Sequence, residues 1–263
     1  MNLKIYKAML SNSIQRVLIY RTTSILIVVF SLFFYFLEMF SGMVYFSYTD
    51  NILGWTKWDY FSLITTAAII QNSYSFFFVW GTSDLSINII QGKLDYTLLR
   101  PLNSFWYYAL YMADFPSLIN VILGIIVQGW IIFKYHIGFF HIIMYILFVI
   151  IGIWFQFLVC NFSNMITFWV DKADQILWIP ETLEEISSRP ASIYPKWVRG
   201  LLMWLLPILT AINLPVDIIR GKINMFNMLW YIGFVAFFTV INYKVWYAGL
   251  KKYQSSNLSL IHI

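Results

Sequence analysis

Five apolar segments limit what this chain can fold into, because each is long enough to cross a lipid bilayer. A membrane-spanning helix needs about 20 mostly apolar residues. Of the 263 residues, 60% are hydrophobic and 11% are charged, whereas soluble domains are about half apolar and about a quarter charged. The sequence therefore predicts an all-α integral membrane protein and excludes a self-contained soluble enzyme or nucleic-acid-binding protein. The five segments are Thr22–Phe46, Tyr60–Trp80, Phe105–Phe133, Phe139–Val170 and Phe226–Trp246.

Residues 1–21 predict an amphipathic helix that lies in the membrane plane before the first span. Apolar side chains recur at helical spacing from Leu3 to Val17, and Lys4 and Lys7 fall on the other face of this helix. An N-terminal extension of the first span fits the same pattern. Both interpretations place these cations on the cytoplasmic side.

The distribution of Lys and Arg predicts that both termini are cytoplasmic. Cations concentrate in the N-terminal segment, in the second loop at Lys93 and Arg100, and at Lys251 and Lys252, and loops rich in cations face the cytoplasm. Two cytoplasmic termini require an even number of spans, and we expect six. The tail, residues 253–263, is expected to be disordered or loosely docked.

Residues 171–223 allow two topologies. In the first, which hydropathy alone favours, Gly200–Ile219 is the fifth span. In the second, Ala173–Ile186 crosses the membrane, and residues 189–222 form an external, partly re-entrant pair of short helices. Prolines interrupt regular helices, which favours the second topology, since Pro207 and Pro215 fall inside the first topology's span. The second topology places carboxylates within or beside a short span, where they must face protein or water; these are Asp174, Glu181, Glu184 and Glu185.

The chain lacks the sequence patterns of catalytic and cofactor sites. It has no G-x-x-x-x-G-K-[ST] phosphate-binding loop. Its single cysteine, Cys160, excludes a disulfide within the chain. His136 and His141 have no third ligand at metal-binding spacing. We therefore expect no catalytic, cofactor-binding or metal-ligating residue in this chain.

The second cytoplasmic loop, residues 81–103, predicts a short helix between two spans. Ser83 or Asp84 can cap this helix, and Gly92 suits its left-handed C-terminal stop. Its apolar residues fall on one side; they are Leu85, Ile89 and Ile90. An interfacial helix that only rests on lipid fits the pattern, as does a lever on which a soluble partner can push.

Two runs of residues resemble a known family. The run GKLDYTLLRPLN from Gly92 to Asn103, the run RPASIYPKWVRGL from Arg189 to Leu201, and Pro207 with Leu214-Pro215 are similar to the permeases of type-2 ABC exporters. The closer resemblance is to a bacterial branch with the motifs G-x-L-D-x-x-L-L-R-P-L-N and Y-P-x-x-I-Y-P-x-x-L-R. This chain has Arg189-Pro190 where the branch usually has Tyr-Pro.

The resemblance implies a six-span permease of the bacterial plasma membrane that dimerises with itself or with a sister permease. Cytoplasmic ABC ATPase subunits would bind ATP and Mg²⁺, so this chain would need no cofactor of its own. The family's coupling helix maps onto residues 84–92, with 93–101 as its trailing arm, and its external re-entrant helices map between the last two spans. The residues expected to dock the ATPase are Asp84, Leu85, Ile89, Gln91, Gly92, Lys93, Asp95 and Arg100.

Two carboxylates in apolar segments are candidates for a substrate pathway, because ionisable groups inside a membrane are costly. Glu38 falls about two-thirds along the first span, and Asp114 just precedes Pro116. A hydrogen bond to a Tyr or Ser would also explain Glu38, and a kink or a loop contact would explain Asp114. The leading hypothesis is an exporter of an amphipathic, peptide-, drug- or lipid-like substrate. The alternatives are an ion-gradient-driven carrier, a membrane enzyme acting on lipid, and an immunity or scaffold protein.

Overall fold

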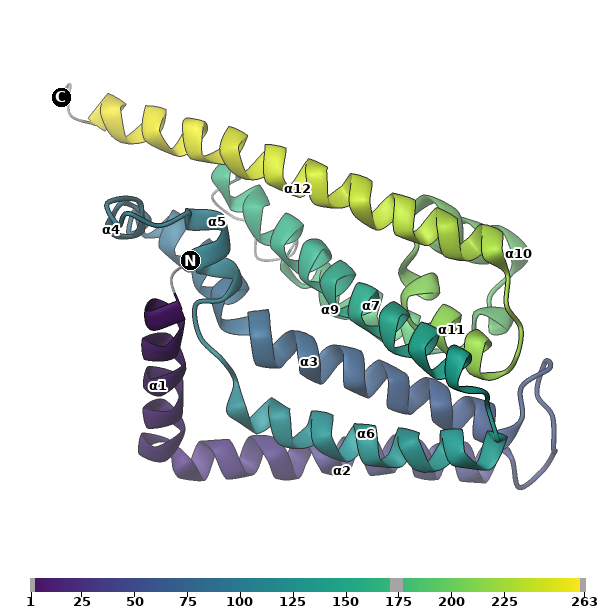
Figure 1. Cartoon of the computed structure of the whole chain (residues 1–263). Helices are drawn as coiled ribbons and strands as arrows, with labels where there is room; N and C mark the ends of the chain where they lie inside the picture. Colours follow the sequence, from purple (N-terminus) through teal and green to yellow (C-terminus); the bar gives the residue numbers. More distant parts are fainter. Residues whose placement is uncertain (1–2, 171–176, 261–263) are drawn as a thin grey trace.

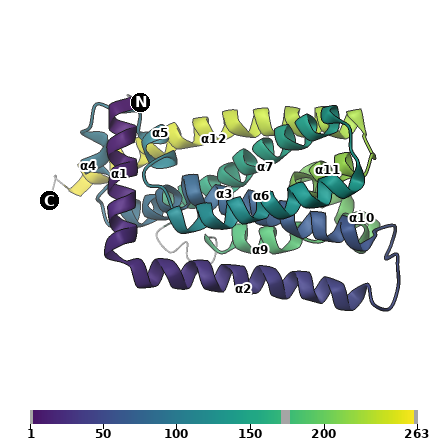
Figure 2. The ribbon, with the colours of Figure 1, turned by 60° about the horizontal axis from the view of Figure 1, so that its bottom comes forward.

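The computed structural model describes residues 3–170 and 177–260, and these form helices and short turns with no β-strand. Most long helices lie side by side in a bundle, and the N-terminal helix stands across one end of it (Figures 1 and 2). The α-helices are α1 (Leu3–Ile19), α2 (Arg21–Tyr45), α3 (Lys57–Ile90), α4 (Asp95–Leu98), α5 (Ser104–Ala109), α6 (Phe115–Tyr135), α7 (Phe139–Met165), α9 (Ile179–Ser187), α10 (Lys196–Gly200), α11 (Ile208–Ile219) and α12 (Met225–Leu260). Short 3-10 turns (Ile166–Phe168 and Ala191–Ile193) and a π-helical turn (Leu201–Leu205) join some of them.

The helix α3 runs through the centre of the bundle, and both its ends have a local cause. At its start, the Thr56 hydroxyl accepts a hydrogen bond from the Asp59 backbone N–H, and the Asp59 carboxylate accepts one from the Thr56 N–H. This reciprocal cap satisfies two backbone donors that a helix start leaves unpaired. At its end, Gly92 adopts φ +68°, a left-handed conformation that glycine takes without steric cost.

Buried polar side chains of α3 bond to three neighbouring helices. Within hydrocarbon the hydrophobic effect does not drive helices together, so packing and interhelical hydrogen bonds hold them. The hydroxyl of Thr66 lies 3.0 Å from that of Tyr145 on α7, and Gln128 on α6 donates to the Ser62 hydroxyl at 2.9 Å. The hydroxyl of Thr65 lies 2.9 Å from that of Tyr35 on α2. The helix α3 is therefore bonded to α2, α6 and α7.

Four helices of the described residues are long and apolar enough to cross a membrane by themselves; they are Arg21–Tyr45, Phe115–Tyr135, Phe139–Phe168 and Met225–Tyr253. The predicted span Tyr60–Trp80 lies inside α3. This helix is less apolar than those four, since it carries buried Ser and Thr side chains. The predicted segment Phe105–Phe133 is not one continuous helix, since α5 covers its start, α6 covers its remainder, and the residues between them are not helical. Pro116 lies in the first turn of α6, where its missing N–H costs nothing. Pro215, by contrast, lies inside α11 and does not interrupt it.

The N- and C-terminal segments are both helical. The helix α1 turns sharply away from α2 near Tyr20, as Figures 1 and 2 show, so it is not a straight extension of the first span. At the other end, α12 continues to Leu260. Residues 253–260 are therefore helical and not disordered, and residues 261–263 lie outside the described residues.

The segment Gly200–Ile219 is not one straight span. The helical residues Lys196–Leu205 and Ile208–Ile219 meet at an angle of 91°, because Leu206 is extended and Pro207 begins a new helix. Ile212 and Val216 of α11 pack in one cluster with Tyr145 and Val149 of α7. Part of the alternative crossing, Ala173–Ile186, lies outside the described residues, and its remainder contains most of α9.

The C-terminal end of α11 is bonded to the start of α3. Arg220 Nε lies 3.3 Å from Asp59 Oδ2, and the two side chains are 7% and 8% exposed. Arg220 also pairs with Asp217 at 2.9 Å and lies over the Trp55 ring, while the Tyr135 hydroxyl donates to Asp59 at 2.5 Å. This buried network joins α3, α6 and α11 at one end of the bundle.

Replacing Arg220 by an apolar residue of similar length should destabilise the protein. In Arg220→Met, the Asp59 carboxylate stays buried without its cation, which costs about 3–5 kcal/mol. Thermal unfolding in detergent, followed by tryptophan fluorescence, should show a large drop in Tm. Adding Asp59→Asn should restore part of it, because the most deeply buried carboxylate of the network is then neutral; Asp217, whose side chain is 33% exposed, still lacks its partner. Asp50→Asn, in an exposed loop, is the control. An unchanged Tm in Arg220→Met would contradict the role of this network.

Candidate functional site

Residues 84–92 are the last turns of α3 and not a separate helix, so the prediction of a helix capped by Ser83 or Asp84 is wrong. No proline interrupts α3 from Lys57 to Ile90, and Gly81 lies inside it. The predicted stop at Gly92 is confirmed. The N–H of Gly92 donates to Ile89 O at 3.2 Å, and that of Lys93 donates to Asn88 O at 2.8 Å, which is the double hydrogen bond of a left-handed helix end.

The hairpin after α3, residues 91–103, is held rigidly against α5. Leu94 is fully buried, and the Tyr108 hydroxyl accepts from Asn88 at 3.1 Å and lies 3.2 Å from the Thr97 hydroxyl. Asn103 caps α5 by accepting from the Trp106 N–H at 3.2 Å. Burial raises the pKa of the Tyr108 hydroxyl, so it stays neutral at physiological pH. The hairpin therefore has a defined shape.

The structure separates the predicted docking residues into exposed and buried ones. Leu85 and Ile89 are buried in the bundle core, and Asp84 is half-buried. The exposed residues include apolar side chains that the sequence analysis did not include; Tyr96 and Leu99 are 72% and 84% exposed. We call this region the hairpin surface; it consists of Ile87, Ile90, Gln91, Gly92, Lys93, Asp95, Tyr96, Leu99 and Arg100. Tyr96 and Leu99 could have been predicted from the sequence, because they are apolar residues within a polar loop.

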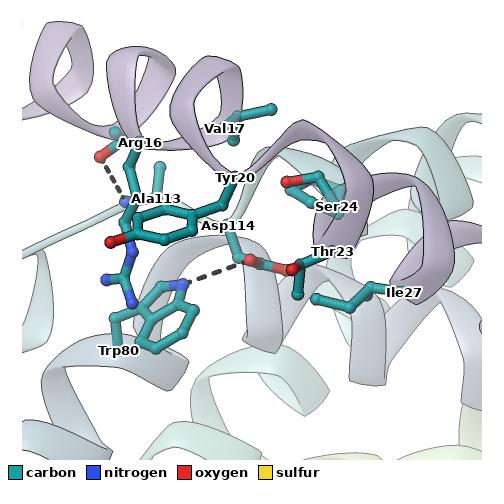
Figure 3. A pocket seen from close by; sticks show the side chains of 11 residues that line it. Arg16, Val17, Tyr20, Thr23, Ser24, Ile27, Trp80, Ala113 and Asp114 are labelled. Carbon is teal, nitrogen blue, oxygen red and sulfur yellow. Dashed lines mark hydrogen bonds between the residues drawn. The ribbon is translucent and has the colours of Figure 1, made fainter.

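Arg16 of α1 binds the N-terminal helix to the same end of α3. Its guanidinium lies 3.9 Å from the Trp80 ring centroid, and its Nη1 lies 2.9 Å from Met112 Sδ. Figure 3 shows Arg16 stacked on Trp80 at the small cavity between α1, α2 and α6. Burial raises the pKa of Asp84, and the charge of Arg16 opposes that rise. The N-terminal helix is therefore electrostatically linked to the hairpin end of α3.

Asp114 caps α6 at this small cavity of about 190 Å³. Its carboxylate accepts hydrogen bonds from the Ser117 N–H, the Ser117 hydroxyl and Trp80 Nε1, the last at 3.2 Å (Figure 3). This loop and helix-cap contact explains the residue without a substrate. Glu38 does not line this cavity, so the structure does not bring the two predicted pathway residues together.

Glu38 lies in a larger cavity of about 670 Å³ between α2, α3 and α9. Its Oε1 is 3.2 Å from Arg189 Nη1, and each side chain is about one-third exposed, at 32% and 37%. Arg189 also donates to the Tyr60 hydroxyl of α3 at 3.3 Å. The cation at the position where this chain departs from the motif of the bacterial branch is thus the partner of the carboxylate in the first span. Sequence reasoning missed this pair because the two residues lie far apart in the chain.

Two cysteines placed at Glu38 and Arg189 should cross-link within one chain. The buried Cys160 is the only native cysteine, so Cys160→Ser provides a clean background. In membranes, a short bismaleimide should join Glu38→Cys to Arg189→Cys, detected by mass spectrometry of the cross-linked peptides. The pair Glu38→Cys with Asp114→Cys is the control and should not react. Equal yields for both pairs would contradict the arrangement of α2 and α9.

Adding one methyl group at Gly81 should disrupt the contact between α3 and α5. A Cβ at Gly81 would lie 1.5 Å from the Tyr108 carbonyl oxygen, so the backbone would have to move, at a cost of at least about 2 kcal/mol. Gly81→Ala should lower the yield of monodisperse protein and its Tm. Gly129→Ala in α6, where nothing lies within 4 Å, is the matched control. Normal behaviour of Gly81→Ala would disprove the close packing of the hairpin.

Comparison with known proteins gives one family. The model of the ABC-2 family transporter proteins matches residues 13–257, which is nearly the whole chain and includes both the hairpin surface and the Glu38 cavity. Searches of curated proteins and of solved structures gave no match. Permeases of this family are membrane transport components that work with ABC ATPase subunits. The chain therefore belongs to the ABC-2 transporter family and is a multi-pass membrane component of a transporter.

Proposed function

We propose that this chain is the membrane subunit of an ATP-driven exporter, and that its ATPase subunit binds the hairpin surface. The observation that carries the proposal is the continuity of α3. One end of this helix carries the hairpin surface, and its middle lines the large cavity with Ala67, Ala68 and Gln71. Because a single helix transmits displacement along its axis, a push on the hairpin moves the cavity wall directly.

The hairpin surface suits a soluble partner. Exposed Tyr96 and Leu99 offer apolar anchors, and Lys93, Asp95 and Arg100 surround them with charges of both signs. Aromatic and aliphatic anchors inside a polar rim are typical of the centres of protein interfaces. ATP and Mg²⁺ would be bound by the partner, whose closure on ATP would act through α3 and turn the cavity from inward-facing to outward-facing.

We propose six crossings with both termini in the cytoplasm, and the second topology for residues 171–223. The bend of 91° supports a re-entrant pair. Trp204, next to the bend, contacts Phe226 at the start of α12, and α11 ends at Arg220 beside Asp59 at the start of α3. The starts of α3 and α12 lie at the same end of the bundle (Figure 1). Both arms of the pair therefore lie at the end away from the hairpin, which we assign to the external side.

Substitutions on the hairpin surface should uncouple the partner without unfolding the permease. We expect Tyr96→Ala with Leu99→Ala, or Lys93→Glu, to weaken co-purification with the partner ABC ATPase by roughly tenfold, as for interface anchors. Permease-stimulated ATP hydrolysis in proteoliposomes should fall in parallel. Tyr48→Ala, an exposed residue in the loop at the other end of the bundle, is the control and should change neither quantity.

Two results would contradict the proposed function. One is full ATPase stimulation by the hairpin variants. The other is transport in proteoliposomes that continues without ATP and collapses with an ion gradient, which would favour a secondary carrier.

A further inference from the structure

The large cavity continues toward the hairpin end of α3. A second cavity of about 400 Å³ shares Gln71, Glu181 and Glu184 with the first, and it extends to Ser83 and Ser86 near the end of α3. Figure 2 shows α9 between α3 and α2, where its acidic side chains line both spaces. Together they form a path from the hairpin end of the bundle to the Glu38–Arg189 pair, which we call the acidic path.

All four glutamates of the chain line this path, while the described aspartates lie at helix ends or in loops. Arg189 is the one cation among the described lining residues, and it is paired with Glu38. The other three glutamates form no ion pair with a described residue, and one of them, Glu184, accepts a hydrogen bond from Gln156 at 3.4 Å. A carboxylate withdrawn from water is costly unless it meets a cation or donors; Glu38 and Glu184 are partly buried, whereas Glu181 and Glu185 are exposed on the same lining. The glutamates are Glu38, Glu181, Glu184 and Glu185.

The other lining residues point to a ligand with an apolar body and N–H donors. Phe34, Leu37 and Ile64 also line the larger cavity and provide apolar contact. Gln71 lies where the two cavities join, and its Oε1 atom is fully buried with no hydrogen-bond partner among the described residues. A buried acceptor without a donor costs free energy, and a ligand N–H can supply that donor.

We propose that the acidic path binds an amphipathic organic cation with N–H donors, such as a protonated amine with an apolar body. This inference names the substrate class of the proposed exporter and therefore rests on the proposed function. The ammonium group lies among the glutamates, the apolar body contacts Phe34, Leu37 and Ile64, and an N–H donates to Gln71.

The test uses dansylcadaverine, a fluorescent primary amine, and its N-acetyl derivative, which keeps the fluorophore and loses the charge. Binding to the purified full-length permease in detergent is followed by dansyl fluorescence. We expect the amine to bind on the order of tenfold more tightly than the acetylated probe, as for hydrogen bonds to a charged group. Glu184→Gln and Glu185→Gln should each remove most of this preference and leave the binding of the acetylated probe unchanged. Asp50→Asn, which removes a carboxylate outside the path, should preserve the preference.

Further variants separate charge from general disruption. Arg189→Gln frees Glu38 from its pair and should strengthen binding of the amine. Gln71→Leu should weaken binding of the amine more than that of the acetylated probe. Glu185 is exposed, so Glu185→Gln should fold normally. If Glu184→Gln does not fold, Glu185→Gln alone still tests the proposal. Equal affinity for both probes, or loss of preference in Asp50→Asn, would overturn the proposal.

The binding assay requires no ATPase, so its outcome is independent of the proposed function. If the amine shows no preference while the hairpin variants uncouple ATP hydrolysis, the substrate class is wrong and the exporter assignment stands. If the amine binds as expected and no ATPase complex forms, the site stands and the energy source is wrong.

Discussion

The uninterrupted helix α3 is the constraint on which the rest of the structure depends. It starts at a reciprocal cap between Thr56 and Asp59, ends at the left-handed Gly92, and has no break between them. Its buried hydroxyls bond to α2, α6 and α7. In a lipid bilayer such polar contacts and close packing hold helices together. These bonds fix the positions of α2, α6 and α7 relative to α3.

Two ion pairs serve different purposes in this arrangement. The Asp59–Arg220 pair is almost fully buried and shares its charges with Asp217, Tyr135 and Trp55, so it fixes the far end of α3. The Glu38–Arg189 pair is about one-third exposed at a cavity, and an exposed pair contributes little stability. The first pair is therefore a structural anchor, and the second belongs to the lining of the large cavity.

The N-terminal helix α1 is attached to α3 and to the segment before α6. Arg16 stacks on Trp80 of α3, and the Ser13 hydroxyl accepts from the Ala113 N–H at 3.0 Å (Figure 3 shows Arg16 on Trp80). A helix lying at one end of the bundle is thus bonded to the last turns of α3 and to the segment before α6. Displacement of the hairpin by a partner would involve α1 as well as α3.

Local features of the chain were predicted well from its residues. The apolar segments predicted a helical membrane protein, and the Gly92 stop followed from the backbone freedom of glycine. The separate helix over 84–92 was wrong, because Ser83 and Asp84 cap a helix only where the preceding residues leave the helical conformation, and α3 does not. The segment Phe105–Phe133 is divided into α5 and α6, because Asp114 caps a new helix whose first turn holds Pro116.

The sequence by itself determined that the chain enters a membrane as helices and where it turns after α3, since both depend on segment length and on single backbone conformations. The tertiary structure decided which charges meet: Arg189 with Glu38, Arg220 with Asp59, and four glutamates around one path. Such pairs join residues far apart in the chain, so they depend on how the helices pack, and no local pattern encodes them.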